Sequence, residues 1–151
     1  MTGKELWNDF SARRGFSEDG CEEWAFGVEA DLLAELVVNG VKTATASAYP
    51  LYELENEPLP VVGAYSVILD SKEQAVCVIR TTRVAVTPFC EVNEEHAYRE
   101  GEGDRSLRYW REVHEKVFSE WMSEAGLLFT PNMPVVCEEF EVVYMPQNEK
   151  D

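Results

Sequence analysis

The sequence predicts an α+β fold in a single domain that spans residues 1–151. Segments 61–70, 74–86 and 135–144 are rich in Val, Ile and Thr, which favour β-strands. Segment 106–125 instead carries apolar residues at helical spacing. No repeat, low-complexity tract or linker divides the chain. Because the strand patterns lie in the middle and at the end, with helical patterns around them, we expect one sheet flanked by helices.

The first elements are two helices joined by a loop. Thr2 and Glu5 have the spacing of a capping box, so a short amphipathic helix begins there and ends near Gly15. Residues 17–27 are expected to form a loop with buried aromatic anchors. A second helix is predicted from Glu29 to Asn39, because its leucines fall on one stripe and a glycine follows at the C-cap position.

The middle of the chain alternates between turns and strands. Segment 41–47 is small and Thr-rich, which indicates a turn that enters a strand. Segment 49–60 holds three prolines and several acids and is predicted to be a surface loop. Residues 71–73 then form a hairpin turn between the predicted strands 61–70 and 74–86.

The C-terminal part combines helices with a final strand. A short helix is expected over 91–100 and a loop over 100–104. In the predicted helix 106–125 one face collects the apolar side chains, which are Leu107, Trp110, His114, Val117, Phe118, Trp121 and Ala125. The last strand, 135–144, has Phe140, Val142 and Tyr144 in alternation.

Composition narrows the classes of function. The net charge of −16 disfavours a protein that neutralises a long nucleic-acid backbone, whereas a small neutral ligand meets no such barrier. No apolar run of about 18 residues predicts a membrane span, and the N-terminus lacks a signal-peptide pattern. We therefore expect a cytoplasmic protein with reduced cysteines. The four cysteines lack C-x-x-C spacing, and neither a metal site nor a cofactor is predicted.

Segment 39–47 is the first candidate for chemistry. In a regular strand Thr43, Thr45 and Ser47 share one face, and Lys42 points away from Thr45. The two side chains converge only if the backbone bends near Lys42, and Gly40 permits such a bend. An exposed lysine beside a β-forming run is the competing interpretation.

The second candidate is the acidic loop that follows the predicted helix 91–100. Glu100, Glu102 and Asp104 surround two glycines, and this arrangement suits either a ligand loop or a solvated turn. The spacing is neither that of an EF-hand nor that of a P-loop. Asp104 or Ser106 is expected to cap the long helix. Tyr109 lies off the apolar stripe and is a candidate for stacking on a base.

These segments together carry a family resemblance. The motifs Trp24-x-Phe26-Gly27, Gly40-x-Lys42-Thr43-Ala44-Thr45, Glu100-Gly-Glu-Gly-Asp104 and Ser106-Leu-x-Tyr109-Trp110 resemble ASCH-domain proteins over about residues 20–145. The similar subgroup is the longer bacterial one, usually left as a domain of unknown function. The resemblance implies a PUA-like β-barrel flanked by α-helices, with a polar cleft for a nucleoside or RNA fragment.

The resemblance also implies a set of site residues. Short members of the family deacetylate acetylcytidine with a Lys, a Thr and a Glu, which fall on Lys42, Thr45 and Glu100. These members have an Arg where this chain has Ser47, which weakens the case for phosphate contact. The substrate-binding candidates are Ser47, Tyr49, Asp104, Ser106 and Tyr109.

The favoured hypothesis is an amidohydrolase that acts on an acylated nucleoside or a similar small amide. Thr45 is the nucleophile, and Lys42 is either a neutral base or a charged oxyanion stabiliser. Glu100 shuttles a proton or orients the substrate amine. One alternative is a non-catalytic module that binds RNA or a modified nucleotide. Another is a metal-assisted ribonuclease that uses Glu100, Glu102 and Asp104.

Overall fold

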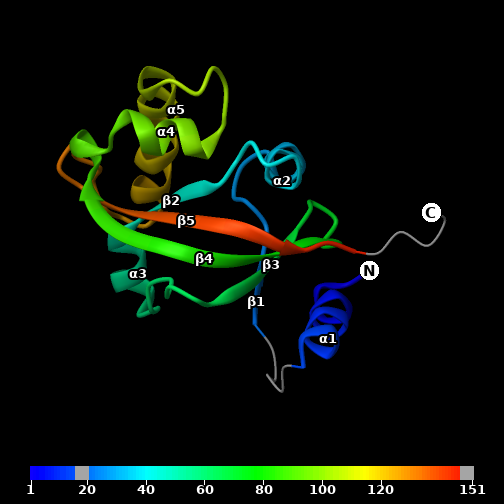
Figure 1. Cartoon of the computed structure of the whole chain (residues 1–151). Coiled ribbons are helices and arrows are strands. Elements are labelled where there is room, and N and C mark those ends of the chain that lie inside the picture. The colour runs from blue at the N-terminus through cyan, green and yellow to red at the C-terminus, as the bar shows by residue number, and fades with distance from the viewer. Residues whose placement is uncertain (16–20, 147–151) are drawn as a thin grey trace.

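A curled, five-stranded sheet organises the computed structural model, which describes residues 1–15 and 21–146. Its strands run in the order β1 (Glu22–Trp24), β3 (Tyr65–Leu69), β4 (Ala75–Pro88), β5 (Pro134–Tyr144) and β2 (Ala44–Ala48). Strand β1 pairs with β3 in parallel, and the other pairs are antiparallel. The sheet forms a half-barrel with helices on both sides, so the predicted α+β, PUA-like architecture is confirmed (Figure 1).

Two irregularities bend the long central strands. The register between β4 and β5 shifts at Val78/Ile79 and again between Thr81 and Arg83. Such bulges increase local twist and bend the strand that carries them. The extra residue is Val143 on β5 at the first shift and Thr82 on β4 at the second, so each of these two long strands carries one bulge.

Strand β1 is one element that the sequence prediction missed. The expected loop 17–27 contains this three-residue strand, and residues 17–20 lie outside the described part of the chain. Glu22 and Glu23 are exposed and give no apolar alternation to detect. Only pairing with Ser66 and Val67 on β3 makes this segment a strand.

The first two helices cover opposite faces of β3 and β4 (Figure 1). Helix α1 (Gly3–Arg14) has the predicted capping box and packs on Val67. Helix α2 (Ala30–Val38) packs on Ile68, the next residue along the strand. Because consecutive strand residues point to opposite faces, each of these two neighbours is covered by a different helix.

Helix α3 (Tyr49–Glu55) corrects the predicted surface loop 49–60. Pro50 lies in the first turn of the helix, where its fixed φ favours helix formation and its missing N–H costs nothing. The prolines of segment 49–60 therefore did not prevent a helix from forming at its start. The predicted strand 61–70 begins later, at Tyr65, because Val61 to Ala64 form a turn.

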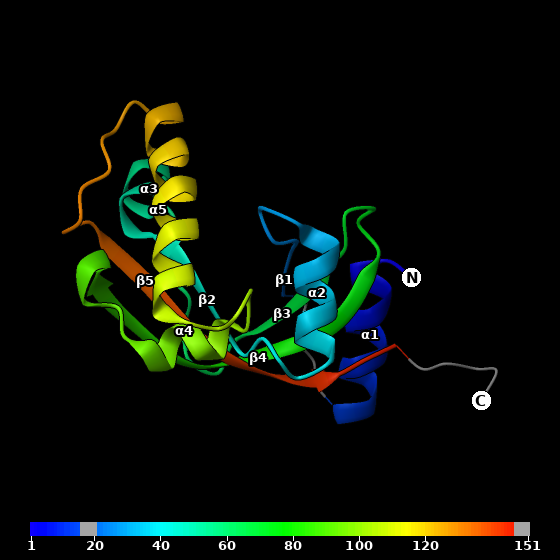
Figure 2. The ribbon, with the colours of Figure 1, turned by 90° about the horizontal axis from the view of Figure 1, so that it is seen from above.

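The remaining helices cover the other end of the sheet (Figure 2). A 3-10 turn (Phe89–Glu91) leads to α4 (Glu94–Glu100), and α5 (Leu107–Glu124) is the predicted long helix. Trp110, Phe118 and Met122 are the buried residues of α5, whereas Val117 on the predicted face is only half-buried. In the described part of the chain, no helix is both long and apolar enough to cross a membrane.

Candidate functional site

The two edge strands of the curled sheet face each other across a pocket. Its volume is about 950 Å³. Strand β1 and the segment after it form one wall, β2 and α3 form another, and the concave face of the sheet supplies the floor. Aromatic side chains contribute much of the lining, namely Trp7, Trp24, Phe26, Tyr52, Tyr65 and Trp121. Among the described residues the lining includes acids but no Lys, Arg or His.

Thr45 lies on this wall beside a buried carboxyl group. It is half-buried in β2 and pairs directly with Glu138 of β5. Residues in directly opposed positions project to the same face of a sheet. Glu138 is 8% exposed, and its Oε2 accepts a 2.7 Å hydrogen bond from the Thr81 hydroxyl. Burial raises the pKa of Glu138, the Thr81 hydrogen bond lowers it, and the net change is upward.

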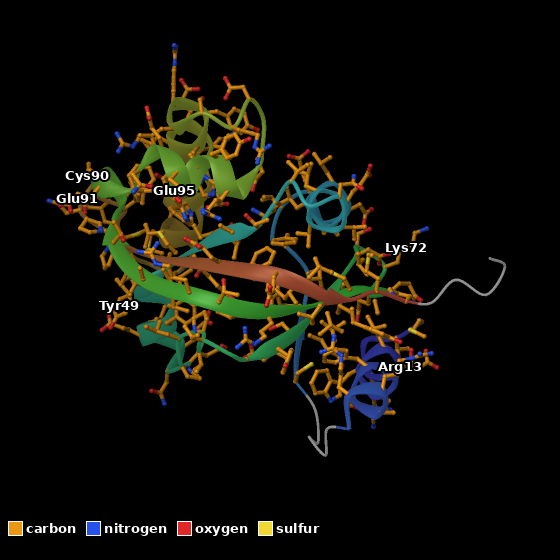
Figure 3. The ribbon with its side chains drawn as sticks, viewed as in Figure 1. Arg13, Tyr49, Lys72, Cys90, Glu91 and Glu95 are labelled. Atoms are coloured by element: carbon orange, nitrogen blue, oxygen red, sulfur yellow. The ribbon has the colours of Figure 1, made fainter. Side chains whose placement is uncertain are left out.

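Ser47 is the second predicted residue that lines the pocket. Its Oγ lies 2.8 Å from the Tyr52 hydroxyl of α3, and burial raises the pKa of that tyrosine. The predicted binding residue Tyr49 lies at the first position of α3, at the outer margin of the molecule (Figure 3). Tyr52, one turn later on the helix, lines the pocket.

Lys42 is almost fully buried, with 1% of its surface exposed. After α2, Gly40 adopts a φ of +78° and turns the chain toward β2. The Lys42 Nζ then donates to Glu100 Oε1 at 3.1 Å and to Glu102 Oε2 at 2.8 Å. The competing interpretation of Lys42 as an exposed surface residue is therefore wrong.

A close backbone approach holds α4 against the start of β2. The Thr43 N–H donates to the Arg99 carbonyl at 2.7 Å, and a Cβ on Gly101 would lie 2.5 Å from the Val41 carbonyl oxygen. Gly101 also has a φ of +74°. A glycine at this position lets the C-terminus of α4 reach the Lys42 segment.

Glu100 is the centre of a buried polar network. Its Oε2 accepts a 2.7 Å hydrogen bond from the Trp110 indole N–H and lies 2.7 Å from His96 Nε2. Because an ionised carboxylate only accepts hydrogen bonds, His96 Nε2 carries the proton in this pair. His114 stacks on Trp110 with ring centroids 4.3 Å apart, and its Nε2 lies 3.7 Å from Glu100 Oε1.

These contacts favour a charged Lys42 and an ionised Glu100. Burial alone would lower the pKa of Lys42, but the Glu100 and Glu102 carboxylates raise it above its ordinary value. Burial alone would raise the pKa of Glu100, but Lys42 and the two histidines hold it far below its ordinary value. Of the two predicted roles for Lys42, the geometry favours the ammonium ion over the neutral base.

Phe26 contacts both parts of the site. Its ring lines the pocket, and the Lys42 Nζ lies 5.3 Å from the ring centroid. The structure thus joins Lys42 to Glu100 and places Thr45 and Ser47 on the pocket wall. That Lys42, Thr45 and Glu100 act around one cleft stays a prediction.

The other predicted residues organise the start of α5. Ser106 is the N-cap, and its side chain accepts from the Tyr109 N–H at 3.0 Å. Asp104 accepts from the Ser106 N–H at 2.9 Å. The Tyr109 ring packs on Gly103, where a Cβ would lie 2.5 Å from it. Within residues 1–15 and 21–146, no three His, Cys, Asp or Glu side chains are grouped so that they could hold a metal ion.

Glu138 and Tyr52 are pocket residues that the sequence analysis did not identify. One signal could have found Glu138. It shares the alternation of Val136, Phe140 and Val142 in β5, so a carboxyl group lies at an inward position of an otherwise apolar strand face. A buried acid at such a position is uncommon unless it is partnered or functional.

Comparison with known proteins agrees with this architecture. The family model for the ASCH domain matches residues 22–144. A crystal structure from Enterococcus faecalis V583, assigned to the family model DUF984, is 37% identical, with a TM-score of 0.89 over 95% of this chain and 88% of that chain. The ASCH domain from Lactobacillus crispatus JV V101 is 30% identical, with a TM-score of 0.86 over 94% of each chain. No curated protein sequence matches.

Proposed function

The chain belongs to the ASCH-domain family, and from that premise we propose that it is an amidohydrolase that removes the acyl group from an N-acylated nucleoside or a similar small amide. The observation that carries this proposal is the arrangement of Thr45 on the pocket wall and the buried Lys42–Glu100 pair behind Phe26. A pocket of about 950 Å³ is large enough for a nucleoside.

Thr45 is the nucleophile in this proposal. Its side chain is half-buried and faces the pocket, where its hydroxyl can attack an acyl carbon. Attack places negative charge on the former carbonyl oxygen. A fixed positive charge near that oxygen stabilises the transition state more than the ground state.

In this proposal Lys42 supplies that positive charge from behind Phe26, across the ring rather than by direct contact with the substrate, and Glu100 keeps it in place. The pKa of Lys42 is raised by its two carboxylate partners, so the ammonium form is maintained at neutral pH. Glu100 is in turn positioned by the Trp110 N–H and by His96. Glu100 therefore acts in this mechanism as a positioning residue rather than as the proton shuttle.

The character of the pocket supports a small uncharged substrate. Its acids are Glu22, Glu23, Glu57 and Glu138, and in the described chain no cationic side chain lines it. A phosphate would enter beside these acids without a compensating charge. The aromatic side chains instead offer flat surfaces for a heterocyclic ring.

Two alternative functions have less support. A module that binds phosphate through Lys42 would need an accessible ammonium group, but this one is 1% exposed and already bound by two carboxylates. A metal-assisted ribonuclease would need Glu100 and Glu102 as ligands, but both carboxylates are already paired with Lys42.

Turnover of N-acetylcytidine by purified protein, with and without EDTA, tests the proposal. We expect EDTA-insensitive hydrolysis in the wild type, loss of activity in Thr45→Ala and retained activity in Thr45→Ser, which keeps a hydroxyl. Lys42→Arg keeps a positive charge but cannot act as a neutral base, so partial activity in this variant supports charge stabilisation. Nucleoside binding without turnover, unchanged in Thr45→Ala, would instead indicate a binding module.

A further inference from the structure

Attack by Thr45 requires a group that accepts its proton. Lys42 is unsuited to this role, because its Nζ already donates to Glu100 and Glu102 and its positive charge is stabilised by both. Three of the acids in the pocket lining, Glu22, Glu23 and Glu57, are exposed. Glu138 is the one buried acid among the described residues of the lining.

The strand register places Glu138 beside Thr45. These two residues are direct partners in the antiparallel pairing of β2 with β5. The Cβ atoms of directly opposed residues are about 4.5–5.5 Å apart, and both side chains project from the same face. The register thus places the Glu138 carboxyl within side-chain reach of the Thr45 hydroxyl.

The surroundings of Glu138 suit a group that gains and loses a proton. Thr81 on β4 donates to Oε2 at 2.7 Å, and within the described residues Oε1 has no hydrogen-bond partner. The titratable groups that face the carboxyl are Glu22 on β1 and Tyr52 on α3. With no cation beside it in the pocket lining, its negative charge is destabilised by burial, which makes it a stronger base than an exposed glutamate.

We infer that Glu138 is the general base that activates Thr45. This inference rests on the proposed function, since it assumes that Thr45 is the nucleophile. Glu138 takes the hydroxyl proton as Thr45 Oγ1 bonds to the acyl carbon and the carbonyl π electrons move to oxygen. When the tetrahedral intermediate collapses, the C–N bond breaks and the leaving nitrogen takes the proton from Glu138. Water then attacks the acyl-threonine, with Glu138 accepting the proton of the water and returning it to Thr45 as the carboxylic acid leaves.

The kinetic test compares Glu138→Gln with Glu139→Gln. Glu139 is the next residue of β5, lies outside the pocket lining and pairs with Arg83 on the surface, so the same chemical change there leaves the pocket intact. With N-acetylcytidine as substrate, Glu138→Gln should lower kcat about 100-fold or more with little change in KM. Glu139→Gln should match the wild type, and Glu138→Asp should recover part of the lost activity.

The pH dependence supplies a readout that a purely structural role would not change. The acid limb of kcat/KM should report the ionisation of Glu138. Thr81→Val removes a hydrogen bond that lowers the pKa of Glu138, so this variant should move the limb to higher pH. An acid limb that stays in place in Thr81→Val would overturn the assignment.

A second measurement does not depend on nucleoside turnover. The probe is p-nitrophenyl acetate, and mass spectrometry measures acetylation of Thr45. Acetylation should occur in the wild type and in Glu139→Gln and should fall sharply in Glu138→Gln. Equal acetylation in Glu138→Gln, or none in the wild type, overturns the inference. Nucleoside hydrolysis that survives in Glu138→Gln also overturns the inference that Glu138 is the general base, but it leaves the proposed function standing. Glu138-dependent acetylation without nucleoside hydrolysis refutes the proposed substrate instead.

Discussion

Replacing Lys42 with Met should be strongly destabilising, because it leaves Glu100 as a buried charge without its cation. The two side chains are 1% and 2% exposed, and their charged atoms are 3.1 Å apart. Breaking a buried ion pair by removing one partner costs about 3–5 kcal/mol. Glu100 would keep its Trp110 hydrogen bond and its His96 contact, so we expect about 3 kcal/mol, at the lower end of that range.

Urea denaturation followed by both fluorescence and circular dichroism measures this cost and shows whether unfolding is two-state. Glu100→Gln and the double variant with Lys42→Met complete a double-mutant cycle. We expect a coupling of about 2 kcal/mol, since the double variant contains neither buried charge of this pair. The control is the exposed pair Arg108–Glu112, whose coupling should be below about 0.5 kcal/mol.

The same cycle predicts a pH dependence. The folded state lowers the pKa of Glu100 below its ordinary 4.5, so its ionised form contributes stability that is present above that pH and is lost as the pH falls. The stability difference between wild type and Glu100→Gln should therefore be constant near neutral pH and shrink below about pH 4.5. Two results would refute the ionised buried pair. One is a loss of unfolding free energy below about 1 kcal/mol in Lys42→Met, and the other is a stability difference between wild type and Glu100→Gln that does not change as the pH is lowered.

Two further predictions concern local geometry. Gly101→Ala should lower the free energy of unfolding by more than about 2 kcal/mol. The added Cβ would lie 2.5 Å from the Val41 carbonyl oxygen, and alanine is also strained at the left-handed φ of this position. Gly126 has a similar φ of +76° but open space around it, so in chemical denaturation Gly126→Ala should lower the free energy of unfolding by nearer to about 1 kcal/mol. Equal losses in the two variants would contradict the close approach of Gly101 to Val41. Cys90 is exposed (Figure 3) and should react rapidly with a thiol reagent at pH 8. Buried Cys77, whose pKa is raised to about 12, should react only on unfolding. Fast labelling of Cys77 in the native protein would show that this part of the core opens.

Local patterns in the sequence were sufficient to predict most of the helices and strands. The capping box at Thr2 and the apolar periodicity of α5 depend on residues three or four positions apart, and the structure has both. The alternation in β5 likewise appears within one short segment. These patterns can be detected in the sequence because neighbours along the chain determine both the contacts within a helix and the alternation of a strand.

The family resemblance predicted the partnership of Lys42 with Glu100, but the charge state of that pair needed the tertiary structure. The two residues are 58 positions apart, and their spacing gives no information on burial. Only the folded chain brings Lys42 against Glu100 and Glu102 and places His114 near Glu100, and these contacts determine which protonation states are stable. Local composition around Lys42 was equally consistent with an exposed lysine.

The elements that depend on distant contacts were decided by the tertiary structure alone. Strand β1 has no alternation of its own and exists through its pairing with β3. Glu138 is visible in the sequence as an acid at an inward strand position, but its placement opposite Thr45 follows from the register of β5 against β2. The sequence by itself therefore determined the α+β class, the main elements and the Lys42, Thr45 and Glu100 candidates. The pocket and its buried acid arise from strand pairings between residues far apart in the chain, which no short-range pattern encodes.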